Sequence, residues 1–284
     1  MKYLGYYNGE YGELENMKIP MNDRVCFFGD GVYDATYSRK YNIFALDEHI
    51  DRFFNSAKAL DINLDFDKKY LANLLKDLVK KCDDGNLFVY WQATRGTQIR
   101  NHAYDENTKA NLWVVLKPCD IVDMSKKINV VTQKDTRFLH CNIKTLNLIP
   151  TVMASQRALR EGVHETVFHR DGRVTECAHS NVHILKDGRL ITPPADNLIL
   201  AGVARAHLMA ICEKLGLIVE VRPFNLKEML KADEIIVTSA GSLCLQVGEV
   251  DGKKVGGKAE GLIKKLQSAL LDEFITATDG DNDR

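Results

Sequence analysis

The amino-acid sequence predicts an α+β protein of two domains, residues 1–119 and 125–284, joined by a linker at 120–124. Segments with the two-residue period of strands alternate with segments that have the 3.6-residue period of helices along the whole chain. The pattern breaks at Lys117-Pro118-Cys119-Asp120, and a polar stretch runs from there to Lys127. With 284 residues, of which 45% are apolar and 27% charged, the chain can bury one large or two modest cores.

The first elements that the sequence predicts in this domain are two strands and two helices. Tyr33 to Arg39 and Asn42 to Leu46 are expected to be strands joined by a short turn, and Asp47 is expected to be the N-cap of the helix that follows. The apolar residues of this helix recur at helical spacing, as do those of the next: Ile50, Phe53, Phe54, Ala57 and Leu60, then Leu71, Leu74, Leu75 and Leu78. Leu87 to Arg95 and Ala110 to Lys117 are rich in β-branched and aromatic residues, which predicts strands.

The second domain restarts with a strand at Ile128 to Thr132. Asp171-Gly172 and Asp187-Gly188 are signals for tight hairpins between strand-like runs. Ala204, Leu208, Ile211 and Leu215 form a helical stripe that Gly216 ends, and Asn225 with Glu228 resembles a capping box. The last helix carries Leu262, Ile263, Leu266, Leu270 and Phe274, and we expect the polar residues Thr278 to Arg284 to fray.

Composition excludes several classes of function. The formal net charge is -1, so there is no basic excess for binding nucleic acid. No stretch is long enough for a membrane span, and the first residues lack the apolar run of a signal peptide. The seven cysteines form no Cys-x-x-Cys pair and are odd in number, which disfavours zinc ribbons and disulfide frameworks and favours reduced thiols in a cytoplasmic protein.

A lysine and an acid about thirty residues apart suggest a particular chemistry. Lys144 could form a Schiff base, and Glu176 could hold a pyridinium nitrogen, which together are the minimum requirement for pyridoxal phosphate (PLP) catalysis. Alone the pair proves little, because most lysines are solvated surface groups. The rest of the sequence therefore decides how much weight the pair carries.

Other residues could complete a site for a phosphorylated cofactor and an anionic substrate. Arg52 lies on the first predicted helix, where a salt-bridged surface arginine is the simpler interpretation. Arg100 and His102 follow a strand and could both face one anion, although loops also carry such residues by chance. Gly202-Val203-Ala204-Arg205 begins a helix whose free N–H groups could hold a phosphate, and Thr238-Ser239-Ala240-Gly241-Ser242 follows a strand and could offer further donors.

Seven blocks in order resemble the PLP-dependent class IV (fold type IV) aminotransferases, and within them the D-amino-acid (D-alanine) branch. The blocks are DRVCFFGDGVYD at 23–34, EHIDRFF at 48–54, TRGTQIRNH at 94–102, CNIKTLNLI at 141–149, VTECAHSNV at 174–182, LAGVAR at 200–205 and VTSAGS at 237–242. The resemblance runs from about Tyr6 to Leu270. It implies a smaller N-terminal α/β domain, a larger C-terminal domain with a mixed, barrel-like sheet, and a site in the cleft between domains.

The resemblance also implies a role for each matching residue. Lys144 would be the catalytic Schiff-base lysine, Glu176 the acid on the pyridine nitrogen and Arg52 the arginine on the cofactor phosphate. Arg137 would line the site near Lys144, Leu200 would pack against the ring, and the backbone around Val203, Ala204, Ser239 and Ala240 would hold the phosphate. Tyr33, Arg100 and His102 would bind the substrate carboxylate. In the D-specific branch Arg100 and His102 come from the neighbouring subunit, which implies a homodimer with shared sites that acts on D-amino acids and 2-oxo acids such as 2-oxoglutarate.

The sequence departs from the family at four positions. Ala204, Ala240 and Gly241 stand where the family often has threonine, and His179 where it often has serine. Each lost hydroxyl removes a hydrogen bond worth about 1 kcal/mol, while backbone N–H groups could still donate, so we expect weaker cofactor retention. The small residues at 240 and 241 also resemble the branched-chain branch. A branched-chain L-amino-acid aminotransferase, a 4-amino-4-deoxychorismate lyase and a catalytically silent PLP-binding protein therefore stay open as alternatives.

Overall fold

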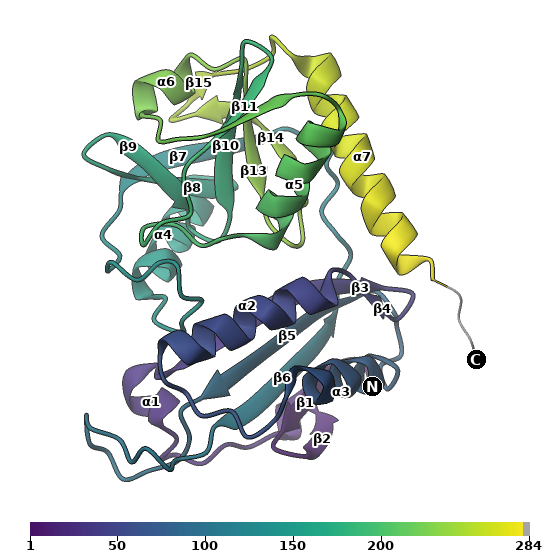
Figure 1. Ribbon diagram of the computed structural model, residues 1–284, viewed down its shortest axis with the longest axis vertical. Coiled ribbons are helices and arrows are strands. Elements are labelled where there is room, and N and C mark those ends of the chain that lie inside the picture. The colour runs from purple at the N-terminus through teal and green to yellow at the C-terminus, as the bar shows by residue number, and fades with distance from the viewer. Residues whose placement is uncertain (281–284) are drawn as a thin grey trace. The chain divides into compact units, whose positions relative to one another are not determined.

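The computed structural model describes residues 1–280 and divides the chain into two compact units (Figure 1). Unit 1 comprises Met1–Asp120, Ile143–Asn147 and the described part of Phe274–Arg284, and unit 2 comprises Ile121–Asn142 and Leu148–Glu273. The first long stretch of unit 1 ends one residue after the boundary expected at 119. Two short segments that the sequence assigned to the second domain, 143–147 and the end of the last helix, belong to unit 1.

Unit 1 is built on an antiparallel sheet of six strands in the order β2-β1-β6-β5-β3-β4. The strands are β1 (Leu4–Tyr7), β2 (Glu10–Glu13), β3 (Gly31–Arg39), β4 (Asn42–Ile43), β5 (Leu87–Thr94) and β6 (Asn111–Pro118). The helices are α1 (Arg24–Phe28), α2 (Leu46–Ala59) and α3 (Lys68–Val79), and a 3-10 turn spans Leu14–Asn16. Helix α2 packs on β3 and α3 on β5, and Figure 1 shows α2 running across the sheet. Their apolar faces and the buried side chains of the sheet form one core.

The start of α2 differs from the prediction. Strand β4 ends at Ile43, so the expected strand to Leu46 is too long, and the N-cap is Ala45, with a left-handed φ of 49°, rather than Asp47. The hydroxyl of Thr36 donates to the carbonyl of Phe44, which holds the chain beside β3 until Ala45 turns it into the helix. Asp47 therefore lies in the first helical turn, where its charge favours the helix dipole without capping it.

Unit 2 contains a mixed nine-stranded sheet, which confirms the expected architecture. Its main order is β12-β11-β10-β13-β14-β7-β8-β9, with β15 paired to β14. The strands are β7 (Ile128–Lys134), β8 (Glu165–Arg170), β9 (Arg173–Cys177), β10 (Asn181–Lys186), β11 (Arg189–Thr192), β12 (Ile218–Val221), β13 (Glu234–Thr238), β14 (Leu245–Val250) and β15 (Lys253–Lys254). The helices are α4 (Ile149–Arg160), α5 (Val203–Lys214), α6 (Leu226–Leu230) and α7 (Glu260–Thr278), the last of which ends in unit 1. The parallel pairs β7–β8 and β11–β12 are each linked through a helix, as parallel strands require.

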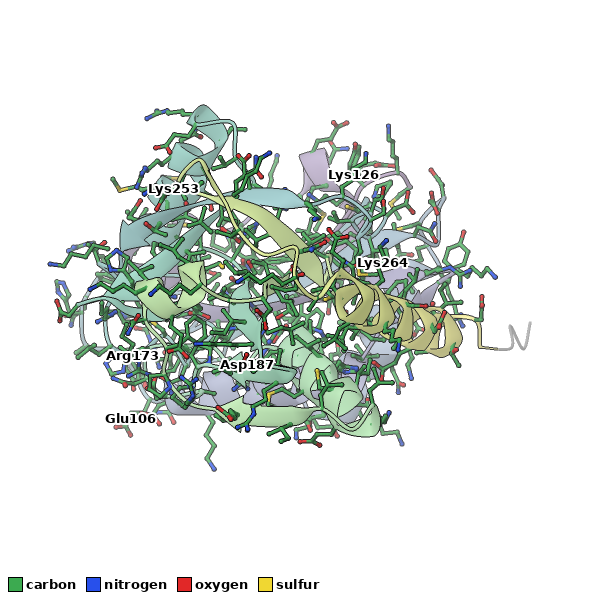
Figure 2. All side chains as sticks on the ribbon, turned by 90° about the horizontal axis from the view of Figure 1, so that it is seen from above. Glu106, Lys126, Arg173, Asp187, Lys253 and Lys264 are labelled. Carbon is green, nitrogen blue, oxygen red and sulfur yellow. The ribbon has the colours of Figure 1, made fainter. Side chains whose placement is uncertain are left out.

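The two hairpin signals of this unit are confirmed, whereas the expected capping box forms only one of its two hydrogen bonds, because the carboxylate of Glu228 bonds Arg222 instead. Asp171-Gly172 and Asp187-Gly188 both have positive φ and join β8 to β9 and β10 to β11 (Figure 2 labels Asp187). The side chain of Asn225 accepts a hydrogen bond from the backbone N–H of Glu228 at the start of α6.

The sequence analysis also did not predict β1, β2, α1 and α4, and it misjudged the end of α7. Helix α4 gave no clear pattern because Ala154 and Ala158 are its buried residues, whereas its large apolar side chains, Ile149, Val152, Met153 and Leu159, are exposed. Thr278, expected to fray, is instead fully buried as the last residue of α7, where its hydroxyl donates to the carbonyl of Phe274. Residues 281–284 of the expected frayed tail lie outside the described residues.

Among residues 1–280, no helix combines the length and the apolar character needed to cross a membrane. All seven cysteines lie within this range and are free thiols.

Candidate functional site

Lys144 is held at the edge of the sheet of unit 1. Its carbonyl accepts a hydrogen bond from the N–H of Tyr33 at 2.9 Å, and Thr145 forms an isolated bridge with Val32 of β3. The N–H of Lys144 donates to the hydroxyl of Ser56 on α2 at 3.2 Å. The segment can approach this closely because β3 begins with Gly31, where an added Cβ would lie 2.7 Å from the side chain of Leu146.

The amine of Lys144 lies against the ring of Tyr33. Its Nζ atom is 4.3 Å from the ring centroid, and no carboxylate among residues 1–280 pairs with it. The ring of Tyr33 stacks on Tyr90 of β5, with centroids 5.5 Å apart, which fixes one wall beside the amine. A half-buried lysine held by its backbone and bonded to no acid is suited to attack a carbonyl carbon.

Arg52 is oriented by a buried acid that the sequence analysis did not identify. Its Nε and Nη2 atoms donate to Oδ2 and Oδ1 of Asp34 at 2.9 and 2.7 Å. His49, one turn earlier on α2, bonds the same carboxylate through Nδ1 at 2.8 Å. Because a carboxylate only accepts, Nδ1 of His49 carries the proton in this bond.

The charges of this group follow from burial and pairing. Burial alone would raise the pKa of the Asp34 carboxyl, but Arg52 and His49 hold it well below its usual range. Burial lowers the pKa of His49, although the Asp34 charge acts in the opposite direction. Asp34 is therefore an anion that fixes Arg52, and the imidazole of His49 beside it is neutral.

Arg100 and His102 lie together on the exposed loop between β5 and β6. The guanidinium carbon of Arg100 lies 5.2 Å from the centroid of the Phe28 ring. The ring centroids of His102 and Phe28 are also 5.2 Å apart. Buried Arg24 fixes the loop, since it donates to the carbonyls of Asn101 and His102 at 2.6 and 3.1 Å. Arg100 and His102 are thus both exposed on a loop with a fixed backbone; Glu106 of the same loop is labelled in Figure 2.

Glu176 in unit 2 is surrounded by hydrogen-bond donors. Its Oε1 atom pairs with Nη1 of Arg137, and its Oε2 atom accepts from the Nδ2 of Asn181 at 3.0 Å and the N–H of Leu200 at 3.1 Å. The side chain of Glu176 is 7% exposed. Donors on both oxygens favour the charged form, which is the form that can accept a hydrogen bond from the N–H of a cationic ring nitrogen.

Arg137 is held in turn by Asp135, which lies fully buried beneath it. Nε and Nη2 of Arg137 donate to the two oxygens of Asp135 at 3.0 and 2.9 Å, and Arg170 adds a bond to the same acid. Burial opposes the charge of Arg137, but Asp135 and Glu176 raise its pKa above the usual value. Burial likewise opposes ionisation of Asp135, and its arginine partners hold its pKa below the usual value.

The N-terminus of α5 lies next to this acid. Asn181, which binds Glu176, also donates to the carbonyl of Leu200, and its Oδ1 atom would be 2.1 Å from a Cβ added at Gly202. Only glycine lets α5 begin this close, and it leaves the N–H groups of Val203 and Ala204 without intrahelical acceptors. The N-cap residue provides no side-chain cap, so these N–H groups can hold an anion.

A second turn lies beside the first. Thr238, the last residue of β13, pairs in register with Asn181, so the Ser239-Ala240-Gly241 turn begins one residue beyond that pair. The hydroxyls of Ser239 and Ser242 bond each other at 2.6 Å, and the carbonyl of Ser239 accepts from the N–H of Leu243 at 2.9 Å. Two ordered turns therefore flank the start of β10.

His179 pairs with another acid of unit 2, Glu165. Its Nδ1 atom pairs with Oε2 of Glu165, which also accepts from the hydroxyl of Ser180 at 2.5 Å. Burial would raise the pKa of Glu165, but His179 and Ser180 hold it below its usual value. The imidazole itself is largely exposed.

The structure groups the predicted residues into two sets. Unit 1 brings together Lys144, Tyr33 and, through α2, Arg52, while Arg100 and His102 form a separate pair there. Unit 2 brings together Glu176, Arg137, Leu200, Val203, Ala204, Ser239 and Ala240. Asp34, His49, Asp135 and Asn181 were missed; a charged residue at an inward position of a strand, such as Asp34 in β3, was the signal available.

These residues fit the demands of PLP. The aldehyde needs an amine such as Lys144, the ring nitrogen needs a charged acid such as Glu176, and the phosphate needs N–H donors and a cation. The close approach of α5 at Gly202 supplies these donors within a few residues of Leu200, whose N–H bonds Glu176. Nothing in either set is incompatible with the cofactor.

Comparison with known proteins agrees with this chemistry. The family model described as amino-transferase class IV matches residues 31–250. The chain is 36% identical to D-alanine aminotransferase of Bacillus licheniformis over 98% of this chain and 99% of that protein. It is 34% identical to D-alanine aminotransferase of Listeria monocytogenes serotype 4b (strain F2365) over 95% of this chain and 96% of that protein.

Solved structures show the same fold. The T.th. branched-chain amino acid aminotransferase, in complex with N-(5'-phosphopyridoxyl)-L-glutamate, has a TM-score of 0.88 at 22% identity and covers 98% of this chain and 95% of its own. The Escherichia coli branched-chain amino acid aminotransferase has a TM-score of 0.88 at 20% identity, and the match covers 100% of this chain and 98% of that chain. At these identities the likeness establishes the fold, while the sequence matches along the full chain establish the family. The protein belongs to the class IV aminotransferases, and like them it is a PLP-dependent enzyme that acts on amino acids and 2-oxo acids.

Proposed function

We propose that the protein is a D-amino-acid transaminase, which moves the amino group of a D-amino acid such as D-alanine to a 2-oxo acid such as 2-oxoglutarate. The observation that carries this proposal is the match, along nearly the whole of both chains, to curated D-alanine aminotransferases. The paired Arg100 and His102 on one ordered loop support it, since two cationic-capable groups suit an α-carboxylate.

The residues of unit 2 would hold the cofactor. Bound PLP supplies a protonated ring that takes up the negative charge left on the substrate Cα when a proton leaves. Glu176 would accept the hydrogen bond of the ring N–H, and Arg137 would keep Glu176 charged. Leu200 would pack on the ring face, and the backbone N–H groups at Val203, Ala204, Ser239 and Ala240 would bind the phosphate.

The residues of unit 1 would carry out the proton transfer. Lys144 would bind the cofactor and then, as a free amine, move the proton from the substrate Cα. Asp34 orients Arg52 for the phosphate. The ring of Tyr33 would line the substrate side and keep water from the amine.

Arg100 and His102 would act in the site of a neighbouring subunit, in a homodimer. Their exposure supports this arrangement, because a carboxylate trap that serves a second copy must reach beyond its own surface. We also propose that the enzyme works in the cytoplasm, which the seven free thiols support.

The test is a visible spectrum of the purified protein, followed by D-alanine or L-leucine in separate samples. A cofactor band that D-alanine alone converts to that of the amino form supports the proposal. Conversion by L-leucine alone would assign the protein to the branched-chain enzymes and remove the role of Arg100 and His102.

The Lys144→Ala variant tests the assigned base. It should lose turnover, whereas Lys253→Ala, a change at an exposed lysine of β15, should leave it unchanged. Turnover that survives in Lys144→Ala would contradict the assignment of Lys144 as the catalytic lysine.

A further inference from the structure

Four buried polar side chains form one hydrogen-bonded network in unit 2. Nε of Arg205 donates to Oγ1 of Thr192 at 3.1 Å, and Thr192 lies 2.9 Å from Nδ1 of His183. Nε2 of His183 is 2.9 Å from Oγ1 of Thr238. His183 and Thr192 have no exposed surface, Thr238 is 1% exposed and Arg205 is 8% exposed.

The imidazole at the centre of this network is neutral. Burial, together with the nearby charge of Arg205, lowers the pKa of His183 to about 3. A neutral imidazole has one donor and one acceptor. Thr192 accepts from Arg205, so its hydroxyl proton can go to Nδ1, and Nε2–H then donates to Thr238. Each of the three hydrogen bonds therefore has one donor and one acceptor, and all three run in the same direction from Arg205 to Thr238.

The two ends of the network lie at the two turns described above. Arg205 follows Val203 and Ala204 in the first turn of α5, and Nη2 of Arg205 also donates to the carbonyl of Pro193 at 3.0 Å. Thr238 immediately precedes the Ser239-Ala240-Gly241 turn. The network therefore connects the start of α5 to the end of β13 through the interior of the unit.

The charge of the network points to an anion. Arg205 is buried, burial lowers its pKa, and no carboxylate among residues 1–280 pairs with it. A buried cation without an acid is costly unless a negative group is bound near it. A simpler interpretation is that His183 is a core histidine whose polar atoms are satisfied by its neighbours. That interpretation explains the hydrogen bonds, but it does not explain a buried arginine that has no acid partner among residues 1–280.

We propose that His183 and Thr192 are positioning residues for the phosphate end of the cofactor site, and that with Arg205 they fix the spacing of its two backbone turns. This fixed spacing compensates for the hydrogen bonds that threonine hydroxyls would make at positions 204 and 240, where this chain has Ala204 and Ala240. The inference rests on the bound cofactor and on the phosphate contacts proposed above, and it is independent of which amino acid is the substrate.

The test compares two probes that differ only in the phosphate. Apo protein is titrated with PLP and with pyridoxal, and the dissociation constant of each is measured for the unaltered protein and for His183→Phe, which keeps the bulk of the ring but cannot bridge the two hydroxyls. The expected result is PLP affinity weaker by about tenfold with pyridoxal affinity unchanged. Equal weakening of both probes, or no change in either, would overturn the proposal.

Two further variants separate positioning from folding. Thr192→Val removes one hydroxyl at constant shape and should reproduce the selective loss for PLP even where His183→Phe folds poorly. Thr166→Val removes a buried hydroxyl that donates to the carbonyl of Ala154 elsewhere in the unit, so it should lower the thermal stability of the apo protein without changing the ratio of the two affinities.

The same titration separates this inference from the proposed function. If the unaltered protein binds PLP far more tightly than pyridoxal but D-alanine fails to convert the cofactor, the substrate assignment fails while the network can still be tested. If the unaltered protein binds both probes equally, the phosphate end is not where we place it, and the network has no such role.

Discussion

Arg52 and Asp34 form a two-point ion pair across the interface between α2 and β3. Both oxygens of the acid accept from the guanidinium, at 2.9 and 2.7 Å, and the acid has no exposed surface. Removing the charge of Asp34 therefore takes away the buried anion that Nε and Nη2 of Arg52 contact.

We expect Asp34→Asn to lower the free energy of unfolding by about 3 kcal/mol at neutral pH, the cost of breaking a buried pair. The pKa of Asp34 is lower in the folded than in the unfolded state, so its contribution is complete above the unfolded value of about 3.9 and declines as the pH falls toward the folded value. The stability gap between parent and variant should therefore narrow in acid. Urea unfolding at neutral pH and at about pH 3 measures it, and a gap that widens in acid would contradict the pairing.

Glu176→Gln should lower kcat for D-alanine by at least about 100-fold, because a neutral amide cannot stabilise a cationic ring nitrogen. The amide keeps the shape of the side chain, so PLP should still bind. Parallel measurement of kcat and of cofactor occupancy checks this. Near-normal kcat at full occupancy would show that another group holds the ring nitrogen.

Arg100→Ala should raise KM for D-alanine by about tenfold or more, since the carboxylate loses a charged donor. The cofactor should stay bound, because Arg100 lies on a loop of unit 1 and contacts Phe28. Arg160→Ala, a change at an exposed arginine of α4, is the control and should leave KM as it is. Loss of the cofactor from Arg100→Ala would rule out the carboxylate role.

Gly202→Ala should destabilise the protein by about 2 kcal/mol and weaken PLP binding, because the new Cβ displaces Asn181 from Glu176 and Leu200. Gly261→Ala is the matched control, since its Cβ would meet open space on α7 and should stabilise the helix by about 0.5 kcal/mol or more. Thermal unfolding of both variants, with and without PLP, gives the comparison. Equal effects of the two changes would show that the close approach at Gly202 is unimportant.

The sequence predicted elements that depend on local chemistry and missed those that depend on tertiary contacts. Both Asp-Gly hairpins and the Asn225 cap were predictable because each is set within four residues. Helix α4 was missed because its large apolar residues face outward, contrary to the rule that a helix buries its apolar stripe.

The candidate site shows the same division. The resemblance selected Lys144, Glu176 and Arg52 by their place in ordered motifs. Asp34 and Asn181 escaped because their importance lies in partners distant in sequence, such as the pairing of Asn181 with Thr238 across two strands. The network of His183 is likewise invisible in sequence, since its members come from three strands and a helix.

The five residues 143–147 leave unit 2, form the bridge with β3 and return. A gene fragment that ends at residue 120 would therefore encode most of unit 1 but omit Lys144. The complementary fragment would carry Lys144 without β3 and α2, which hold it. Neither fragment could be a self-sufficient half of the enzyme. The two units are interwoven along the polypeptide, so evolution cannot easily have exchanged them as separate modules.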